Sequence, residues 1–300
     1  MSESTPRHVE EYLQQLRQAL KGEDPALVQD ALYDAEEYLR AELAANAHRP
    51  QSEVIAEIVR TYGAPEEVAE VYRKTEATVQ RALKTPRPST GERGAVARFF
   101  GVLADPRAYS SLFYMLLALA TGIFYFTWTV TGVSMSAGFM VLIIGIPFAL
   151  LFLGTIRLLS LLEGRLVEVM LGVRMPRRPV YRAKDDNVLK RVGQFLVDPR
   201  TWSTLLYMLA MLPLGIIYFT IAVTGLSLVL SFLFAPIWTL FDTQLIWFGG
   251  GMVVVHWWEA ALLSVVGFVG LVVLMHLARG IGYLHGQLAK LLLVKVEADS

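Results

Sequence analysis

The sequence predicts an all-α protein, in which a cytoplasmic four-helix bundle precedes a polytopic α-helical membrane domain with four spans built as two parallel two-span repeats. The first observation behind this prediction is composition, since 54% of the 300 residues are hydrophobic although the formal net charge is zero. The second is the distribution of charge, which is concentrated in residues 1–107, in residues 157–200 and in the tail after Arg279. The third is an internal repeat in the apolar remainder, because repeats constrain the architecture of a chain.

The repeat pairs residues 105–134 with residues 198–227, and 18 of the 30 aligned positions are identical. Each copy opens with Asp-Pro-Arg and closes at Val-Thr-Gly and a following serine. Aspartate favours the N-cap of a helix, and proline fits the first helical position, where no backbone hydrogen bond is lost. We therefore interpret both openings as helix starts with a cytoplasmic charge; a ligand site is the alternative interpretation.

Each copy is also predicted to be a membrane span. No charged residue occurs from Ala108 to Ser134 or from Thr201 to Phe241, and a helix needs roughly 20 apolar residues to cross ~30 Å of hydrocarbon. The backbone must satisfy its own hydrogen bonds in lipid, so helices are expected. The first membrane repeat covers residues 95–191 and the second covers residues 192–300. Their predicted spans are about 108–131 and 136–156, then 201–224 and 259–278.

Lysine and arginine residues set the expected orientation. They are frequent in residues 1–100, in residues 157–200 and in the C-terminal tail, but are absent after the first and third spans. By the positive-inside rule both termini are cytoplasmic, in a bacterial inner-membrane protein. Two spans per repeat make the repeats parallel, unlike the inverted repeats of many transporters. Residues 226–258 interrupt the second repeat as an extracytoplasmic excursion, for which we predict interfacial or shallow re-entrant helices.

Residues 1–84 are predicted to form the cytoplasmic bundle, and residues 85–94, rich in Pro, Thr and Gly, a linker. Apolar residues recur at helical spacing in four segments of the bundle. The string Tyr62-Gly63-Ala64-Pro65-Glu66-Glu67, with the acidic segment 33–38, carries a resemblance to the HAAS signalling domain over about residues 8–75. The resemblance implies a cytoplasmic helical module of bacterial regulatory proteins, with no catalytic residues.

The membrane part, from Ala97 to about Val294, resembles the Sensor domain that precedes kinase modules in many actinobacterial histidine kinases. The paired Asp-Pro-Arg starts, the Val-Thr-Gly turns, Gly145-Ile146-Pro147 and the segments 158–163 and 276–280 carry this resemblance. It implies a membrane sensor but no particular ligand. No kinase module accompanies it in this sequence, so the output is expected to pass through the bundle or a partner.

Two groups of residues are candidate functional sites. Tryptophans cluster around the excursion, where an aromatic belt at the membrane interface is one explanation and a lipid- or ligand-facing surface is the other. The candidate signal- or lipid-facing residues are Trp238, Trp247, Trp257, Trp258, Asp242, His256 and Glu259. Small residues permit close helix packing in membranes, and the candidate repeat-interface residues are Gly122, Gly215, Tyr114 and Tyr207.

Catalysis is not predicted. The sequence contains neither a phosphate-binding glycine loop followed by Lys-Ser or Lys-Thr nor a His-Glu-x-x-His motif, and it contains no cysteine for thiolate or disulfide chemistry. His256 and Glu259 are too few ligands for a metal site. The acidic cluster Asp34, Glu36 and Glu37 is expected to be a solvated helix face. No cofactor and no nucleic-acid partner are expected.

The predicted function is a non-enzymatic inner-membrane sensor or regulatory scaffold, which relays an envelope or lipid signal to the cytoplasmic helical domain. Two alternatives remain open. One is an accessory or assembly subunit of a larger membrane complex, for example a transporter, and the other is a lipid-handling membrane protein. The expected partners are membrane lipids, a transporter subunit or regulator, and further copies of the chain in a homo-oligomer.

Overall fold

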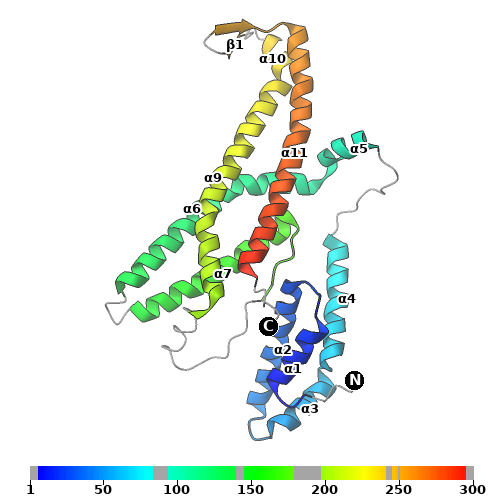
Figure 1. Ribbon diagram of the computed structural model, residues 1–300, viewed down its shortest axis with the longest axis vertical. Helices are drawn as coiled ribbons and strands as arrows, with labels where there is room; N and C mark the ends of the chain where they lie inside the picture. The colour runs from blue at the N-terminus through cyan, green and yellow to red at the C-terminus, as the bar shows by residue number, and fades with distance from the viewer. Residues whose placement is uncertain are drawn as a thin grey trace. The chain divides into compact units, whose positions relative to one another are not determined.

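The structure is a computed structural model and describes residues 6–83, 94–139, 145–178, 197–240, 245–248 and 251–294. The chain divides into two compact units that alternate along the sequence. One unit contains residues 1–87, 132–206 and 288–300, and the other contains residues 88–131 and 207–287. Helices dominate the described residues, so the predicted all-α class is confirmed (Figure 1). The predicted linker lies outside the described residues, except for Gly94.

Four helices form the N-terminal bundle (Figure 1). They are α1 (Val9–Ala19), α2 (Pro25–Ala45), α3 (Gln51–Thr61) and α4 (Pro65–Leu83). Apolar residues three and four positions apart form a stripe on each helix, and the stripes meet in one core in which Tyr12, Leu16, Leu39 and Ile55 are fully buried. This burial stabilises above all α1 and α3, which have 11 residues each, since isolated helices shorter than ~12–15 residues are marginal in water.

The Tyr-Gly-Ala-Pro-Glu-Glu sequence of residues 62–67 forms the turn between α3 and α4. Gly63 has a φ of +113°, a left-handed conformation that glycine adopts without steric cost. Its carbonyl accepts a hydrogen bond from the Tyr12 hydroxyl (2.9 Å), which ties the turn to α1. Ala64 has no capping side chain, but the Glu67 carboxylate accepts the Ala64 backbone N–H (3.1 Å), as in a capping box. The string therefore encodes a helix–turn–helix connection.

Within the described residues, four helices are long and apolar enough to cross a membrane. They are α6 (Pro106–Phe139), α7 (Gly145–Leu171), α9 (Pro199–Leu233) and α11 (Trp257–Leu293), preceded by the short α5 (Ala95–Phe100) and a 3-10 turn (Gly101–Ala104). The four helices hold 34, 27, 35 and 37 residues, whereas roughly 20 suffice to cross the hydrocarbon. Each helix is therefore long enough to place polar residues of its ends outside the apolar layer.

The excursion differs from the prediction in its secondary structure. α9 continues to Leu233, past the predicted span end near residue 224, because no proline or charge interrupts it there. The short α10 (Ala235–Leu240) follows. β1 (Leu245–Phe248) then pairs antiparallel with β2 (Gly251–Val254), with Leu245 opposite Val254 and Phe248 opposite Gly251. The aromatic and β-branched residues of these segments favour a strand pair, which replaces the helix predicted at those positions.

The two copies of the repeat pack against each other at glycines of α6 and α9. A Cβ atom at Gly122 would lie 2.9 Å from the carbonyl carbon of Met211 and closer still to its oxygen. A Cβ atom at Gly215 would meet the carbonyl of Ala118 in the same way, 2.8 Å from its carbon. Each contacted residue lies four positions before the glycine of its own helix, so the contacts are reciprocal. Glycine permits this close approach of two membrane helices.

The glycines that close the two repeat copies also have equivalent neighbours. A Cβ atom at Gly132 would collide with the ring of Phe152 in α7. A Cβ atom at Gly225 would lie 2.7 Å from Cδ1 of Leu274 in α11. Phe152 and Leu274 each lie five residues before the arginine that ends the apolar stretch of their helix. The first helix of each repeat therefore packs on the second at the same place.

Candidate functional site

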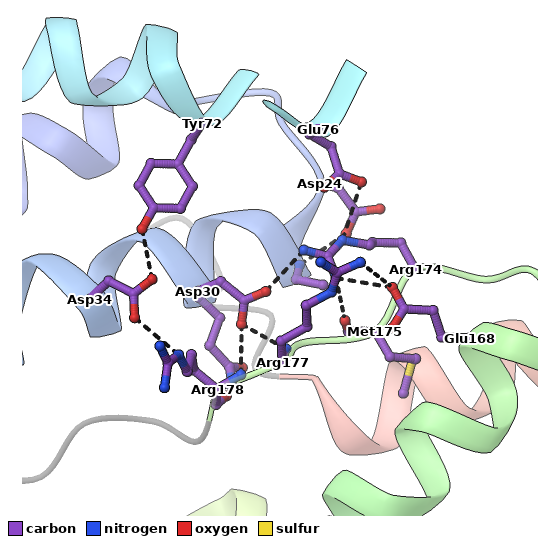
Figure 2. Close-up of polar contacts among 12 residues, drawn as sticks. Asp24, Asp30, Asp34, Tyr72, Glu76, Glu168, Arg174, Met175, Arg177 and Arg178 are labelled. Carbon is purple, nitrogen blue, oxygen red and sulfur yellow. Dashed lines mark hydrogen bonds and ion pairs between the residues drawn. The ribbon is translucent and has the colours of Figure 1, made fainter. Parts of the chain in front are cut away.

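An ion-pair cluster joins the N-terminal bundle to the segment that follows α7. Its centre is Arg174, whose guanidinium contacts three carboxylates (Figure 2). Asp30 of α2 lies 2.9 Å from Nη2, and Glu76 of α4 lies 3.2 Å from Nε. Glu168 of α7 lies 3.1 Å from Nη1. One cation thus connects two helices of the bundle with the end of an apolar helix.

The Arg174 cluster is withdrawn from water. The side chain of Arg174 is 11% exposed, and those of Asp30 and Glu168 are 8% and 7% exposed. Burial alone would lower the pKa of Arg174, but the charges of Glu76, Asp30 and Glu168 raise it, so the guanidinium stays charged. Removing one partner from such a buried group typically costs ~3–5 kcal/mol, because the remaining charges are left uncompensated.

Two further arginines surround the same face of α2. The backbone N–H groups of Arg177 and Arg178 donate to Oδ1 of Asp30 at 2.7 and 2.8 Å. Burial raises the pKa of the Asp30 carboxyl, and these hydrogen bonds oppose that rise. The Arg178 side chain pairs with Asp34 (3.1 Å), whose other oxygen accepts the Tyr72 hydroxyl (2.8 Å; Figure 2). The prediction of a solvated face was therefore wrong for Asp34, because a cation and a hydroxyl from other elements bind it.

The ends of α9 and α11 also contact the bundle. Nζ of Lys290 lies 2.5 Å from Oδ2 of Asp24, the aspartate that caps α2. Nη1 of Arg200 donates to the Gln29 amide oxygen (3.1 Å), and Nη2 donates to the carbonyl of Leu293 (2.9 Å). Residues of α9 and α11, together with the segment that follows α7, thus contact α2 and its cap.

A second polar cluster lies among the apolar helices themselves. His285 of α11 is 1% exposed. Its Nε2 lies 2.7 Å from the Tyr114 hydroxyl of α6 and 3.0 Å from the Tyr207 hydroxyl of α9. Its Nδ1 lies 3.3 Å from the Tyr218 hydroxyl, also of α9. Buried polar groups are costly unless they are paired, so this cluster specifies how α6, α9 and α11 pack.

The Asp-Pro-Arg motif has two roles in each copy. Oδ1 of Asp105 and Oδ1 of Asp198 each accept the backbone N–H two residues later, at 3.0 and 3.1 Å, which caps the helix. The second oxygen pairs with an arginine of the other repeat. Asp105 pairs with Arg279 (3.0 Å), and Asp198 pairs with Arg157 (3.7 Å). The two repeats are therefore joined by two equivalent ion pairs, in addition to the glycine contacts.

The candidate tryptophans of the excursion lie on exposed surface where their side chains are described. Trp257 and Trp258 begin α11 and are 78% and 50% exposed, and Trp238 of α10 is 56% exposed. Exposed indole rings suit contact with lipid headgroups or with a partner. Trp247 lies in β1, and Asp242 lies outside the described residues.

His256 and Glu259 form a helix cap. Oε2 of Glu259 accepts the backbone N–H of His256 (2.8 Å) and lies 3.3 Å from its Nδ1. This is the reach-back contact of a capping box at the start of α11. In the part of the chain that the structure describes, no group of three or more His, Asp or Glu residues is placed to hold a metal.

Of the residues singled out from the repeat, Gly122 and Gly215 lie at the α6–α9 contact, and Tyr114 and Tyr207 meet at His285. The sequence interpretation did not single out His285 or the Arg174 cluster. A signal for His285 was present, since it holds the repeat position of Glu163, which is fully buried. No comparable signal existed for Asp30, because its partners lie more than 130 residues away.

Two family models match the chain. The HAAS model matches residues 11–71, and the model described as "Putative sensor" matches residues 114–293. Comparisons with curated proteins and with solved structures found no match. The two domains occur in the predicted order and point to a non-catalytic signalling role. Because the second match covers more than half of the chain, this multi-pass membrane protein belongs to the Sensor family and carries a HAAS domain ahead of its apolar helices.

Proposed function

We propose that this protein relays a signal from its membrane spans to its HAAS bundle, through the contacts that hold the bundle against the span ends. The observation that carries this proposal is the position of Arg174, which binds Asp30 and Glu76 of the bundle together with Glu168 of α7. Any movement of the α7 end that displaces Arg174 separates its guanidinium from the carboxylates of the bundle and from Glu168 of α7 at the same time. The bundle is then released, and its α2 face becomes available to a partner.

A buried ion cluster suits such a switch better than an apolar contact does. Four arginines (Arg165, Arg174, Arg177 and Arg178) are paired there with four carboxylates (Asp30, Asp34, Glu76 and Glu168). The loss of one partner costs ~3–5 kcal/mol, and each 1.4 kcal/mol is a tenfold change in an equilibrium. A displacement of Arg174, the most buried of the four arginines, that removes one of its partners therefore changes the docked population by a factor on the order of 10²–10³.

The direction of the relay follows from the distribution of charge. The basic residues 157–200 and the bundle belong on the cytoplasmic side of a bacterial inner membrane under the positive-inside rule. The excursion, with exposed Trp257 and Trp258, then belongs on the opposite side and is placed to receive an envelope or lipid signal. α11 connects the excursion to Lys290, which contacts the cap of α2.

The test is photo-crosslinking in native membranes with a photoreactive residue at Arg60, which is exposed on α3. We expect the proteins captured by the bundle to change in identity or amount when Arg174→Gln is introduced. The matched control is Arg49→Gln, which removes one bundle arginine whose partners are Glu53 and Glu57. Capture of the same stoichiometric membrane partner with and without Arg174→Gln would contradict the relay and support an accessory subunit.

A further inference from the structure

A small pocket lies where α7 meets the start of α9. Its volume is about 40 Å³, which is room for roughly three water molecules at ~10–15 Å³ each. Three aliphatic side chains form part of its wall. The polar part consists of Arg157, Ser160, Asp198, Arg200, Thr201 and Thr204. The pocket therefore combines two cations, one anion and three hydroxyl groups in a space suited to one small polar group.

We propose that this pocket binds a phosphate group, as carried by the headgroup of an anionic phospholipid. Two guanidinium groups against one carboxylate give the pocket a net positive charge, and guanidinium geometry matches phosphate oxygens. Thr201 and Thr204 are 8% and 5% exposed, so their hydroxyls lie in surroundings where hydrogen bonds are strong. The start of α9 adds the partial positive charge of a helix N-terminus.

The position of the pocket suits a lipid. It lies at the start of α9 and beside the middle of α7, where Arg157 ends the uncharged stretch, and its aliphatic wall is formed by Leu153, Ile156 and Leu161 of α7. A phospholipid places its phosphate at the interface and its acyl chains along the apolar helix below. Basic pockets between membrane helices on the cytoplasmic side are suited to such headgroups.

The other repeat provides an internal comparison. Asp105 and Arg279 hold the positions of Asp198 and Arg157, but Ala108 replaces Thr201 and Gly282 replaces Ser160, so two of the three hydroxyls are lost. Ala108 is fully buried in the apolar core of α6, α9 and α11. The ion pair there is also tighter, at 3.0 Å against 3.7 Å. The duplicated motif therefore loses two hydroxyl groups and gains an apolar neighbour in one copy, whereas the other copy lines a polar pocket.

Phosphate binding would also act on the bundle, and this part rests on the proposed function. Nη1 of Arg200 donates to Gln29 of α2 at 3.1 Å. A phosphate that draws this guanidinium into the pocket competes with that hydrogen bond. Binding of an anionic lipid is therefore expected to weaken one contact of α2 while leaving the Arg174 cluster in place.

The test measures lipid retention by native mass spectrometry of the full chain, purified with mixtures of phosphatidylglycerol and phosphatidylcholine. We expect Arg157→Gln with Arg200→Gln to lower phosphatidylglycerol affinity at least tenfold. The matched control is Arg107→Gln with Arg279→Gln, which removes the same charge from the equivalent positions of the other repeat and should change affinity less than twofold. Thr204→Val keeps both arginines and the contact between Arg200 and Gln29. It should lower the affinity for phosphatidylglycerol several-fold.

Equal loss in the two double variants would overturn the site, because it would show retention by general surface charge. The source of the phosphate is decided in phosphatidylcholine nanodiscs to which inorganic phosphate is added, with sulfate as the control anion. Thermal stabilisation by inorganic phosphate alone, without selective phosphatidylglycerol retention, assigns the pocket to a soluble phosphate. If neither phosphatidylglycerol nor inorganic phosphate has an effect, the proposal is wrong. Lipid retention and phosphate binding do not require the Arg174 contacts on which the relay rests, so the relay and the pocket fail separately.

Discussion

Tyr114 and Tyr207 hold the same position in the two copies of the repeat, and their hydroxyl groups lie 2.7 and 3.0 Å from one atom, Nε2 of His285. An imidazole nitrogen carries either one proton or one lone pair, so it cannot make two full hydrogen bonds at once. The two hydroxyls therefore share the nitrogen. This point of the α6–α9–α11 contact therefore has two nearly equivalent hydrogen-bond arrangements.

The shared nitrogen predicts a specific pattern of non-additivity. Tyr114→Phe or Tyr207→Phe alone should lower the free energy of unfolding by at most about 1 kcal/mol, because the remaining hydroxyl still pairs with His285. The double variant leaves Nε2 buried without its two hydroxyl partners and should cost about 1–3 kcal/mol more than the sum of the single effects. Denaturant unfolding in micelles measures this, with Tyr283→Phe at a 61% exposed position as the control. Additive effects would mean that the hydroxyls act independently.

The glycine contacts predict a steric effect. Gly122→Ala places a Cβ within 3.0 Å of the Met211 backbone, so α6 and α9 must separate and stability should fall by about 1–3 kcal/mol. Gly215→Ala should behave alike, because its contact is the reciprocal one. Gly138→Ala is the matched control, since a Cβ added there would have no neighbour within 4 Å, and the gain in helix propensity is up to ~1 kcal/mol. Thermal unfolding in micelles compares the three, and equal behaviour of Gly122→Ala and Gly138→Ala would contradict the close contact.

The two roles of the Asp-Pro-Arg aspartate separate by substitution. Asp105→Asn retains the cap but removes the ion pair with Arg279, whose side chain is 48% exposed, so the loss should stay below ~1 kcal/mol and shrink in high salt. Asp105→Ala also removes the cap and should cost a further ~0.5–2 kcal/mol. The free energies of unfolding of the two variants, measured at two salt concentrations, give the contribution of the ion pair and that of the cap. An Asn variant as unstable as the Ala variant would show that the charge, and not the cap, dominates.

The exposed tryptophans predict a loss of response without a loss of fold. Trp257→Ala with Trp258→Ala removes side chains that are 78% and 50% exposed, so membrane insertion and thermal stability should change little. If the excursion receives the signal, the downstream response should be abolished. The control is Trp202→Ala in α9, which is 58% exposed and far from the excursion in sequence. A double variant that inserts and signals normally would leave these tryptophans as membrane anchors.

Much of the membrane fold was predictable because lipid imposes strong local rules. Uncharged stretches of more than 20 residues must be helices, and the repeat at residues 105 and 198 indicated where equivalent contacts would form. The extension of α9 to Leu233 and the β1–β2 pair were not predicted, because apolar content alone does not distinguish a continued helix from a strand in such segments.

The site was predictable only in part. The repeat pointed to Gly122, Gly215, Tyr114 and Tyr207, whose equivalence is visible in the sequence. The Arg174 cluster was not visible, because ion pairs between Asp30 and a segment 144 residues away follow from tertiary packing. Charge counting assigned Arg174 to a basic stretch and gave no hint that its side chain is far more enclosed than that of Arg178.

The most direct test of the proposed relay is a crosslinking measurement in native membranes. The chain contains no cysteine, so Asp24→Cys with Lys290→Cys introduces one thiol pair at positions whose native side chains lie 2.5 Å apart. A short bis-maleimide should join α2 and α11 efficiently in this background, much less when Arg174→Gln is added, and undiminished when Arg60→Gln is added as the control. Equal crosslinking with and without Arg174→Gln, or none in either, would contradict docking of the bundle through Arg174.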